Sequence, residues 1–135
     1  MSGESRAVEI DIVSDPCCPW CVIGYKRLEH ALESLAGEVV ATIRWHAFQL
    51  NPHVPDGGTN LRAHLEAKYG TTRAQSVANR EQLTGLGAAL GFEFDYFEEM
   101  RTFNTLRAHQ LAVWADALGK KHEIELELFL SLIHI

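Results

Sequence analysis

All three cysteines of the chain lie within five consecutive positions. Cys17, Cys18 and Cys21 stand in the stretch PCCPWC, and the remainder of the 135 residues contains none. Structural disulfides would distribute cysteines along the chain, so the clustering points to redox chemistry or to a metal. Cys18 and Cys21 form a C-x-x-C pair, a spacing that places two sulfurs on one helical turn. Such a pair can form a reversible disulfide and exchange it with other thiols.

The residues on either side of the pair predict a strand followed by a helix. Residues 7–15 alternate apolar and polar side chains, whereas apolar residues recur at helical spacing over 19–35. Pro19 suits the first position of that helix. The cysteines therefore fall at a helix N-terminus, where unpaired N–H groups and the helix dipole favour a thiolate. We expect Cys18 to be the more exposed and the more acidic thiol, with the nearby carboxylate of Asp15 opposing that acidity.

The rest of the chain predicts a second strand and then a helical block. Residues 38–52 are rich in β-branched and aromatic side chains, and we expect Trp45 and Phe48 to lie in the core. A crossover of this length predicts two parallel strands with a right-handed connection. A loop follows at 51–60, and helices are expected at 59–69, 72–90, 103–119 and 121–132, with an irregular piece at 92–97. The fold class is therefore α/β, a βαβ unit followed by an all-helical region.

Zinc binding is the main alternative to thiol exchange. A structural zinc site usually takes a second pair of cysteine or histidine ligands. The seven histidines show no pair at ligand spacing: His30, His46, His53, His64, His109, His122 and His134. Redox chemistry is therefore favoured, and we expect no metal. Cys17 fits a small buried side chain at the strand end. It could instead act as a third reactive thiol that competes with Cys21 for Cys18, but neighbouring cysteines bridge only through a strained ring, so we discount that role.

The charge and hydropathy of the chain limit the kinds of partner that we expect the protein to bind. The net charge is −6, and no basic stripe is present to neutralise phosphates, so we expect no nucleic acid. No apolar run approaches the roughly 20 residues of a membrane span, and no secretory signal begins the chain, so we expect a cytoplasmic protein that does not bind membranes.

Three separated motifs resemble one known family. They are SDPCCPWCVIGYKRLEHAL (14–32), FQLNPHVPDGGTNLRAHLEAKYG (48–70) and TFNTLRAHQLAVWADALGKKHEIELELF (102–129). Together they are similar to the FrnE-like branch of the DsbA family. The resemblance implies a thioredoxin-like fold with a helical insertion. Residues 1–55 would then be the βαβ part of the thioredoxin-like domain, and residues 56–129 the helical insertion domain.

The resemblance implies a thiol–disulfide oxidoreductase, with Cys18 as nucleophile and Cys21 as resolving thiol. Its partners would be disulfides or thiols of proteins or small molecules. We expect no cofactor, with glutathione a candidate redox partner and a homodimer a candidate assembly. A sister branch suggests the alternative of a glutathione-dependent isomerase of the 2-hydroxychromene-2-carboxylate type. A zinc-binding or redox-sensing module is the non-enzymatic alternative.

Further substrate-binding residues are expected around the cysteines. They are Pro19, Trp20, Pro52, His53, Asn104 and His109. His109 could stabilise a thiolate electrostatically, but helix packing and capping are the favoured explanation of Asn104 and His109. A rigid turn is the favoured explanation of Pro52 and His53.

The end of the chain departs from the family pattern. The family's thioredoxin fold resumes after the helical block with a strand preceded by a cis-proline, but all prolines here lie in the first half: Pro16, Pro19, Pro52 and Pro55. The final LSLIHI (130–135) can be back-translated to a sequencing-library adapter. We therefore expect a C-terminally truncated chain with a non-native tail, inactive as a fragment.

Overall fold

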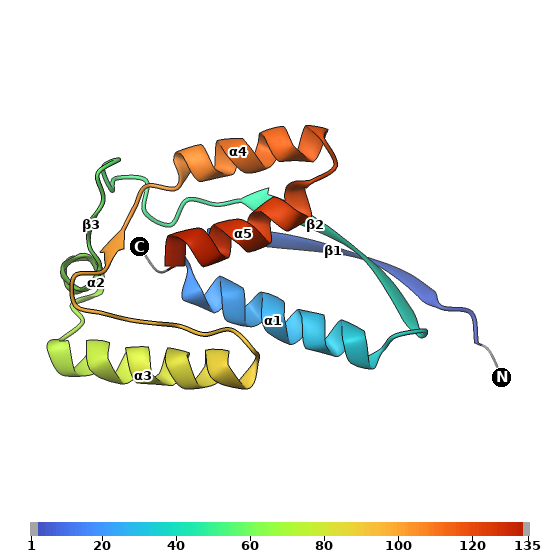
Figure 1. Cartoon of the computed structure of the whole chain (residues 1–135), viewed down its shortest axis with the longest axis horizontal. Coiled ribbons are helices and arrows are strands. Elements are labelled where there is room, and N and C mark those ends of the chain that lie inside the picture. Colours follow the sequence, from blue (N-terminus) through green and yellow to red (C-terminus); the bar gives the residue numbers. More distant parts are fainter. Residues whose placement is uncertain (1–2, 134–135) are drawn as a thin grey trace.

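Two parallel strands joined by a helix form the central unit of this computed structural model, which describes residues 3–133. β1 (Arg6–Ser14) pairs along its whole length with β2 (Val39–Ala47), and α1 (Pro19–Ser34) connects them. Parallel strands cannot be joined by a tight turn, so the chain must cross over, and α1 is that crossover (Figure 1). The predicted βαβ unit is confirmed.

The two faces of this sheet differ in what covers them. Side chains of the inner face, among them Ile12, Ile43 and Trp45, lie in or against the core. The outer face is open and carries Val13, Val40 and Phe48, which are 63%, 57% and 53% exposed. The prediction that Phe48 is a core residue is therefore wrong, because Phe48 comes directly after the end of β2 and its side chain stays exposed.

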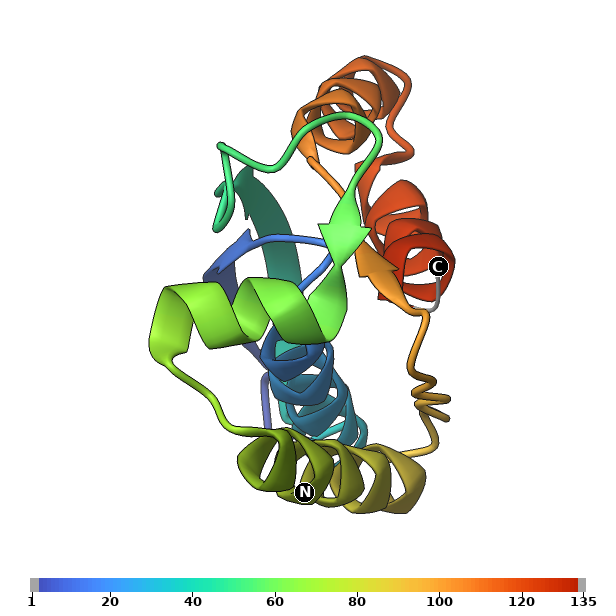
Figure 2. The same ribbon diagram turned by 90° about the vertical axis from the view of Figure 1, so that its left-hand side faces the viewer.

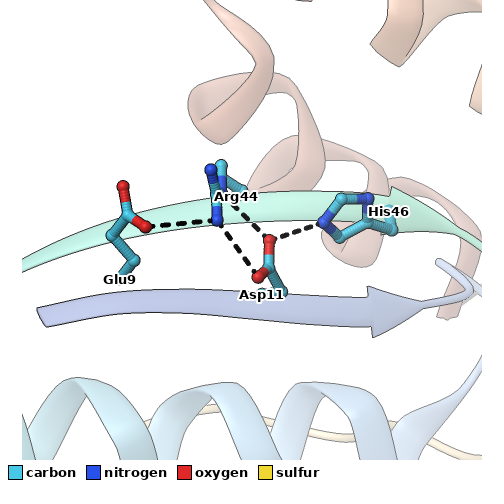
Figure 3. Close-up of polar contacts among 4 residues, drawn as sticks. All are labelled: Glu9, Asp11, Arg44 and His46. Carbon is cyan, nitrogen blue, oxygen red and sulfur yellow. Dashed lines mark hydrogen bonds and ion pairs between the residues drawn. The ribbon is translucent and has the colours of Figure 1, made fainter.

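Polar side chains from both strands contact one another on the open face (Figure 3). Asp11 lies 3.0 Å from the Arg44 guanidinium and 2.7 Å from Nε2 of His46, and Arg44 also reaches Glu9. All four side chains are about half exposed or more, so solvent screens these ion pairs and each contributes little to stability.

The helical block comprises four further helices within residues 3–133. α2 (Leu61–Tyr69) and α3 (Arg73–Ala89) come first, and α4 (Leu106–Ala117) and α5 (Lys121–Ile133) follow an irregular segment. α3 packs against α1, and α5 packs against α4 and β2 (Figure 1). The expected helices are confirmed. Residues 130–133 of the expected tail continue α5, and residues 134–135 lie outside the described residues.

A second, very short sheet was not predicted. β3 (Thr59–Asn60) pairs antiparallel with β4 (Arg101–Thr102) and ties the start of α2 to the segment before α4 (Figure 2). Strands of two residues are too short to show periodicity, so no sequence pattern predicts this pairing.

Candidate active site

The first turn of α1 holds the cysteine pair. Cys18 is the N-cap residue, with extended backbone angles, and Pro19 follows at the first helical position. The backbone N–H of Cys21 donates to Cys18 Sγ at 3.4 Å, so the sulfur occupies the place that a serine or aspartate oxygen usually takes. Cys17, Cys18 and Cys21 are all half-buried free thiols. We expected Cys18 to be more exposed than Cys21, but both thiols are half-buried.

The thiols of Cys18 and Cys21 shift each other's pKa in opposite directions. Their mutual hydrogen bond is the largest cause of both shifts: it raises the pKa of Cys18 and lowers the pKa of Cys21 to about 6. The expectation that Cys18 is the more acidic thiol is not met. The backbone N–H of Asp15 adds to the stabilisation of the Cys21 thiolate. Because the titrations are coupled, the reduced pair as a unit carries one thiolate at neutral pH.

Cys17 differs from its neighbours. Burial, followed by the negative charge of Asp15, raises the pKa of Cys17 to about 12. A thiol in that state is protonated at neutral pH and is a poor nucleophile. Cys17 is therefore not a third reactive thiol in this state of the site.

A buried ion pair lies beneath the cysteines. Asp15 is 2% exposed, and its Oδ1 lies 3.4 Å from Nε2 of His109 on α4. Burial alone would raise the pKa of Asp15, but His109, the Leu50 N–H at 2.8 Å and Thr105 together lower it. The contact with Asp15 in turn raises the pKa of His109. The pair connects the end of β1, the loop after β2 and the helical block.

His109 contacts Asp15, whose charge in turn acts on the pKa of Cys17 and Cys21. Its Nε2 also lies 3.1 Å from the carbonyl oxygen of Phe48, which fixes the imidazole between two elements. The negative charge of Asp15 contributes to the raised pKa of Cys17 and opposes the lowering of the pKa of Cys21. The expected effect of Asp15 on the pKa of Cys18 stays a prediction. A direct role for His109 in substrate binding stays a prediction.

Asn104 organises the loop after β2. Its side-chain amide donates to the carbonyl oxygens of Pro52 at 3.2 Å and Val54 at 3.0 Å, and its oxygen accepts from Gln49. Pro52 and His53 are exposed on that loop. These contacts give Asn104 a structural role in the loop. Substrate binding by Asn104, Pro52 or His53 stays a prediction.

A cavity of about 470 Å³ opens beside the cysteines. Pro19 and Trp20 line it, as does Cys18, whereas Pro52, His53, Asn104 and His109 do not. Trp20 is 51% exposed, as expected for a groove-lining side chain. The opposite wall comes from α2, α3 and the segment before β4, including Leu61, Leu65, Ser76, Arg80, Leu83 and Tyr96. None of these six stands out in the sequence. Five of them lie on helices, where they look like ordinary apolar or solvated positions, and Tyr96 lies in the irregular segment after α3.

Within residues 3–133 the structure contains neither a cluster of metal-binding side chains nor a membrane-spanning helix. No cluster of three or more His, Cys, Asp or Glu side chains is arranged to hold a metal ion. In the same residues, no helix is both long and apolar enough to span a membrane.

A parallel βαβ unit, with a C-x-x-C pair at the N-terminus of its helix and a helical region after its second strand, defines the chain as thioredoxin-like. The family model of the DSBA-like thioredoxin domain matches residues 9–134, and the chain belongs to that family. The crystal structure of a probable DsbA oxidoreductase from Streptomyces coelicolor matches with a TM-score of 0.81 at 25% sequence identity. The match covers 90% of this chain and 52% of that one, so the chain spans about half the length of this relative. No curated protein sequence matches.

Proposed function

We propose that the protein is a thiol–disulfide oxidoreductase that uses Cys18 and Cys21. The observation that carries the proposal is a pair of half-buried free thiols at the start of α1, with the Cys21 N–H donating to Cys18 Sγ, beside an open cavity. A pair in this state supplies a thiolate at neutral pH, which is the species that attacks disulfides. Membership of the DSBA-like family and the likeness to a probable DsbA oxidoreductase support the same chemistry.

The exchange proceeds in two balanced steps. As Cys18 Sγ attacks one sulfur of the substrate disulfide, the Cys18 proton passes to the Cys21 thiolate, the substrate S–S bond breaks, and one substrate thiolate leaves and takes a proton from solvent. Cys21, once deprotonated, then attacks Cys18 Sγ and releases the second substrate thiol. The protein loses two electrons and gains a Cys18–Cys21 disulfide, and the substrate disulfide becomes two thiols. The reverse sequence would oxidise a substrate dithiol.

Cys18 is the better candidate for the attacking sulfur. It lines the cavity, whereas Cys21 lies one turn further along α1 and does not. A substrate in the cavity would therefore meet Cys18 first, and Cys21 would resolve the mixed disulfide. The FrnE-like branch stays a prediction, and the division of labour between the sulfurs is part of the proposal.

Insulin reduction by dithiothreitol tests the proposal. We expect the wild-type chain to accelerate the reaction, and Cys18→Ala and Cys21→Ala each to abolish the acceleration. Cys17→Ala is the matched control, since it removes a sulfur that stays protonated. Acceleration that survives both substitutions would overturn the proposal.

The same variants separate the alternatives. The isomerase alternative needs only one thiol. It would be favoured if glutathione-dependent isomerase activity is lost in Cys18→Ala but is fully kept in Cys21→Ala. Stoichiometric zinc in the purified protein, lost in Cys18→Ala and Cys21→Ala, would indicate the metal-binding module instead.

A further inference from the structure

The cavity beside Cys18 contains a cation that no carboxylate of the described residues neutralises. Arg80 extends from α3 over the ring of Tyr96, with the guanidinium carbon 5.7 Å from the ring centroid. Its Nε and one terminal nitrogen are buried and have no hydrogen-bond partner within residues 3–133. A neighbouring arginine, Arg62, is paired instead with Glu98. Leaving buried guanidinium nitrogens without a partner costs free energy, so these two atoms call for a partner that the described residues do not supply.

A second unpaired donor lies on the same face of α3. Ser76 is 2% exposed, lines the cavity, and its Oγ has no partner within the described residues. Residues 76 and 80 are four positions apart, so their side chains are neighbours on the helix surface. A guanidinium offers only donors, and a hydroxyl can donate alongside it. Together they suit a planar anion with two oxygens, which is a carboxylate.

The remaining wall defines the rest of the ligand. Leu61, Leu65 and Leu83 give the cavity apolar lining, and Trp20 and Cys18 line it as well. A volume of about 470 Å³ suits a small molecule. The occupant should therefore have a carboxylate, an apolar body and a sulfur.

We propose that the cavity takes a low-molecular-weight disulfide that bears a carboxylate, with Arg80 and Ser76 binding the carboxylate and Cys18 attacking the disulfide. This inference rests on the proposed function, whose balanced exchange it adopts: one half of the substrate becomes a mixed disulfide on Cys18 and the other leaves as a thiol. Arg80 would set substrate choice by favouring anionic over neutral disulfides.

Two aromatic disulfides, one anionic and one neutral, test the inference. Dithiobis(nitrobenzoate) carries carboxylates, and dithiodipyridine is neutral at pH 7. The rate constants of the reduced protein with each are measured, and their ratio reports the preference for the anion. We expect Arg80→Met to lower the ratio about 10- to 100-fold, since a charged hydrogen-bonding partner is lost. Ser76→Ala should lower it about 2- to 10-fold.

The matched control is Arg73→Met. Arg73 lies on the same helix with its side chain 75% exposed, so its loss changes the net charge equally without touching the cavity. We expect the ratio to stay at its wild-type value in this variant, which separates local binding from long-range attraction.

The outcomes distinguish the two proposals. If dithiodipyridine reacts no faster with wild type than with Cys18→Ser, the proposed oxidoreductase function is wrong. If it reacts through Cys18 but Arg80→Met and Ser76→Ala leave the ratio at the wild-type value, the carboxylate site alone is wrong. If the ratio falls as far in Arg73→Met as in Arg80→Met, the carboxylate site is also wrong. Should Arg80→Met fail to fold, Ser76→Ala decides alone.

Discussion

The hydrogen bond between Cys18 and Cys21 makes each thiol depend on the other. It is the largest cause that lowers the pKa of Cys21 to about 6. Removing the donor with Cys18→Ala, in a Cys17→Ala background, should therefore raise the pKa of Cys21 back toward its usual value of 9.0. The ultraviolet absorbance of the thiolate, followed against pH, measures the shift. A Cys21 that stays acidic without its partner would show that the α1 N-terminus, and not the hydrogen bond with Cys18, stabilises the thiolate.

The Asp15–His109 pair should make stability depend on pH in both directions. The folded-state pKa of His109 lies above its usual 6.5, so its contribution is complete below that value and is lost as the pH rises through the raised pKa. The folded-state pKa of Asp15 lies below its usual 3.8, so its contribution is present above that value and is lost as the pH falls through the lowered pKa.

The variant His109→Gln tests this dependence. Compared with wild type, we expect it to lose free energy of unfolding near pH 5, where both groups are charged, and to lose less at alkaline pH. Urea unfolding at several pH values measures the difference. His53→Gln, on an exposed loop residue, is the matched control. An equal loss at every pH would indicate that His109 matters for packing and not for its charge.

Among the helices, α3 carries two glycines that should respond in opposite ways to the same substitution. A Cβ at Gly87 would lie 2.4 Å from the Phe94 ring and 2.5 Å from the backbone oxygen of Phe92. A Cβ at Gly85 would meet nothing within 4 Å. Gly85→Ala should therefore stabilise the protein by about 0.5–1 kcal/mol, whereas Gly87→Ala should destabilise it by about 1–3 kcal/mol despite the better helix propensity. Thermal unfolding of both variants measures the contrast, and a gain at both sites would contradict the close packing of α3 on the 92–97 segment.

Elements with a strong local signal could be predicted from the sequence, and those defined by distant contacts could not. The βαβ unit and the helices have clear periodicity. The β3–β4 pair is two residues long on each side, and its partners are far apart in the chain. The C-x-x-C pair is local and was found. The unpaired state of Arg80 and the burial of Asp15 against His109 exist only once the helices pack, so no sequence pattern reported them.

One continuous core joins the sheet to the helical block. It contains Ile23 and Tyr25 from α1, Trp45 from β2 and Leu83 from α3, and Phe129 of α5 packs edge-on against Trp45 with ring centroids 5.9 Å apart. This cluster contains residues from both sides of the boundary at residues 55 and 56, which the family resemblance implies and which stays a prediction. A chain with one core of this kind should unfold in a single cooperative transition.

Phe129→Ala tests that cooperativity. Phe129 is 2% exposed, and its truncation should cost about 3–5 kcal/mol through lost burial and a cavity. Because the core is shared, the loss should appear equally in a probe of the sheet, the fluorescence of Trp45 in a Trp20→Phe, Trp114→Phe background, and in a probe of the helices, the far-ultraviolet circular dichroism. Leu130→Ala, at a neighbouring residue that is 53% exposed, is the control and should cost little. If the fluorescence transition shifts while the helical transition stays in place, the βαβ unit and the helical block fold as separate domains.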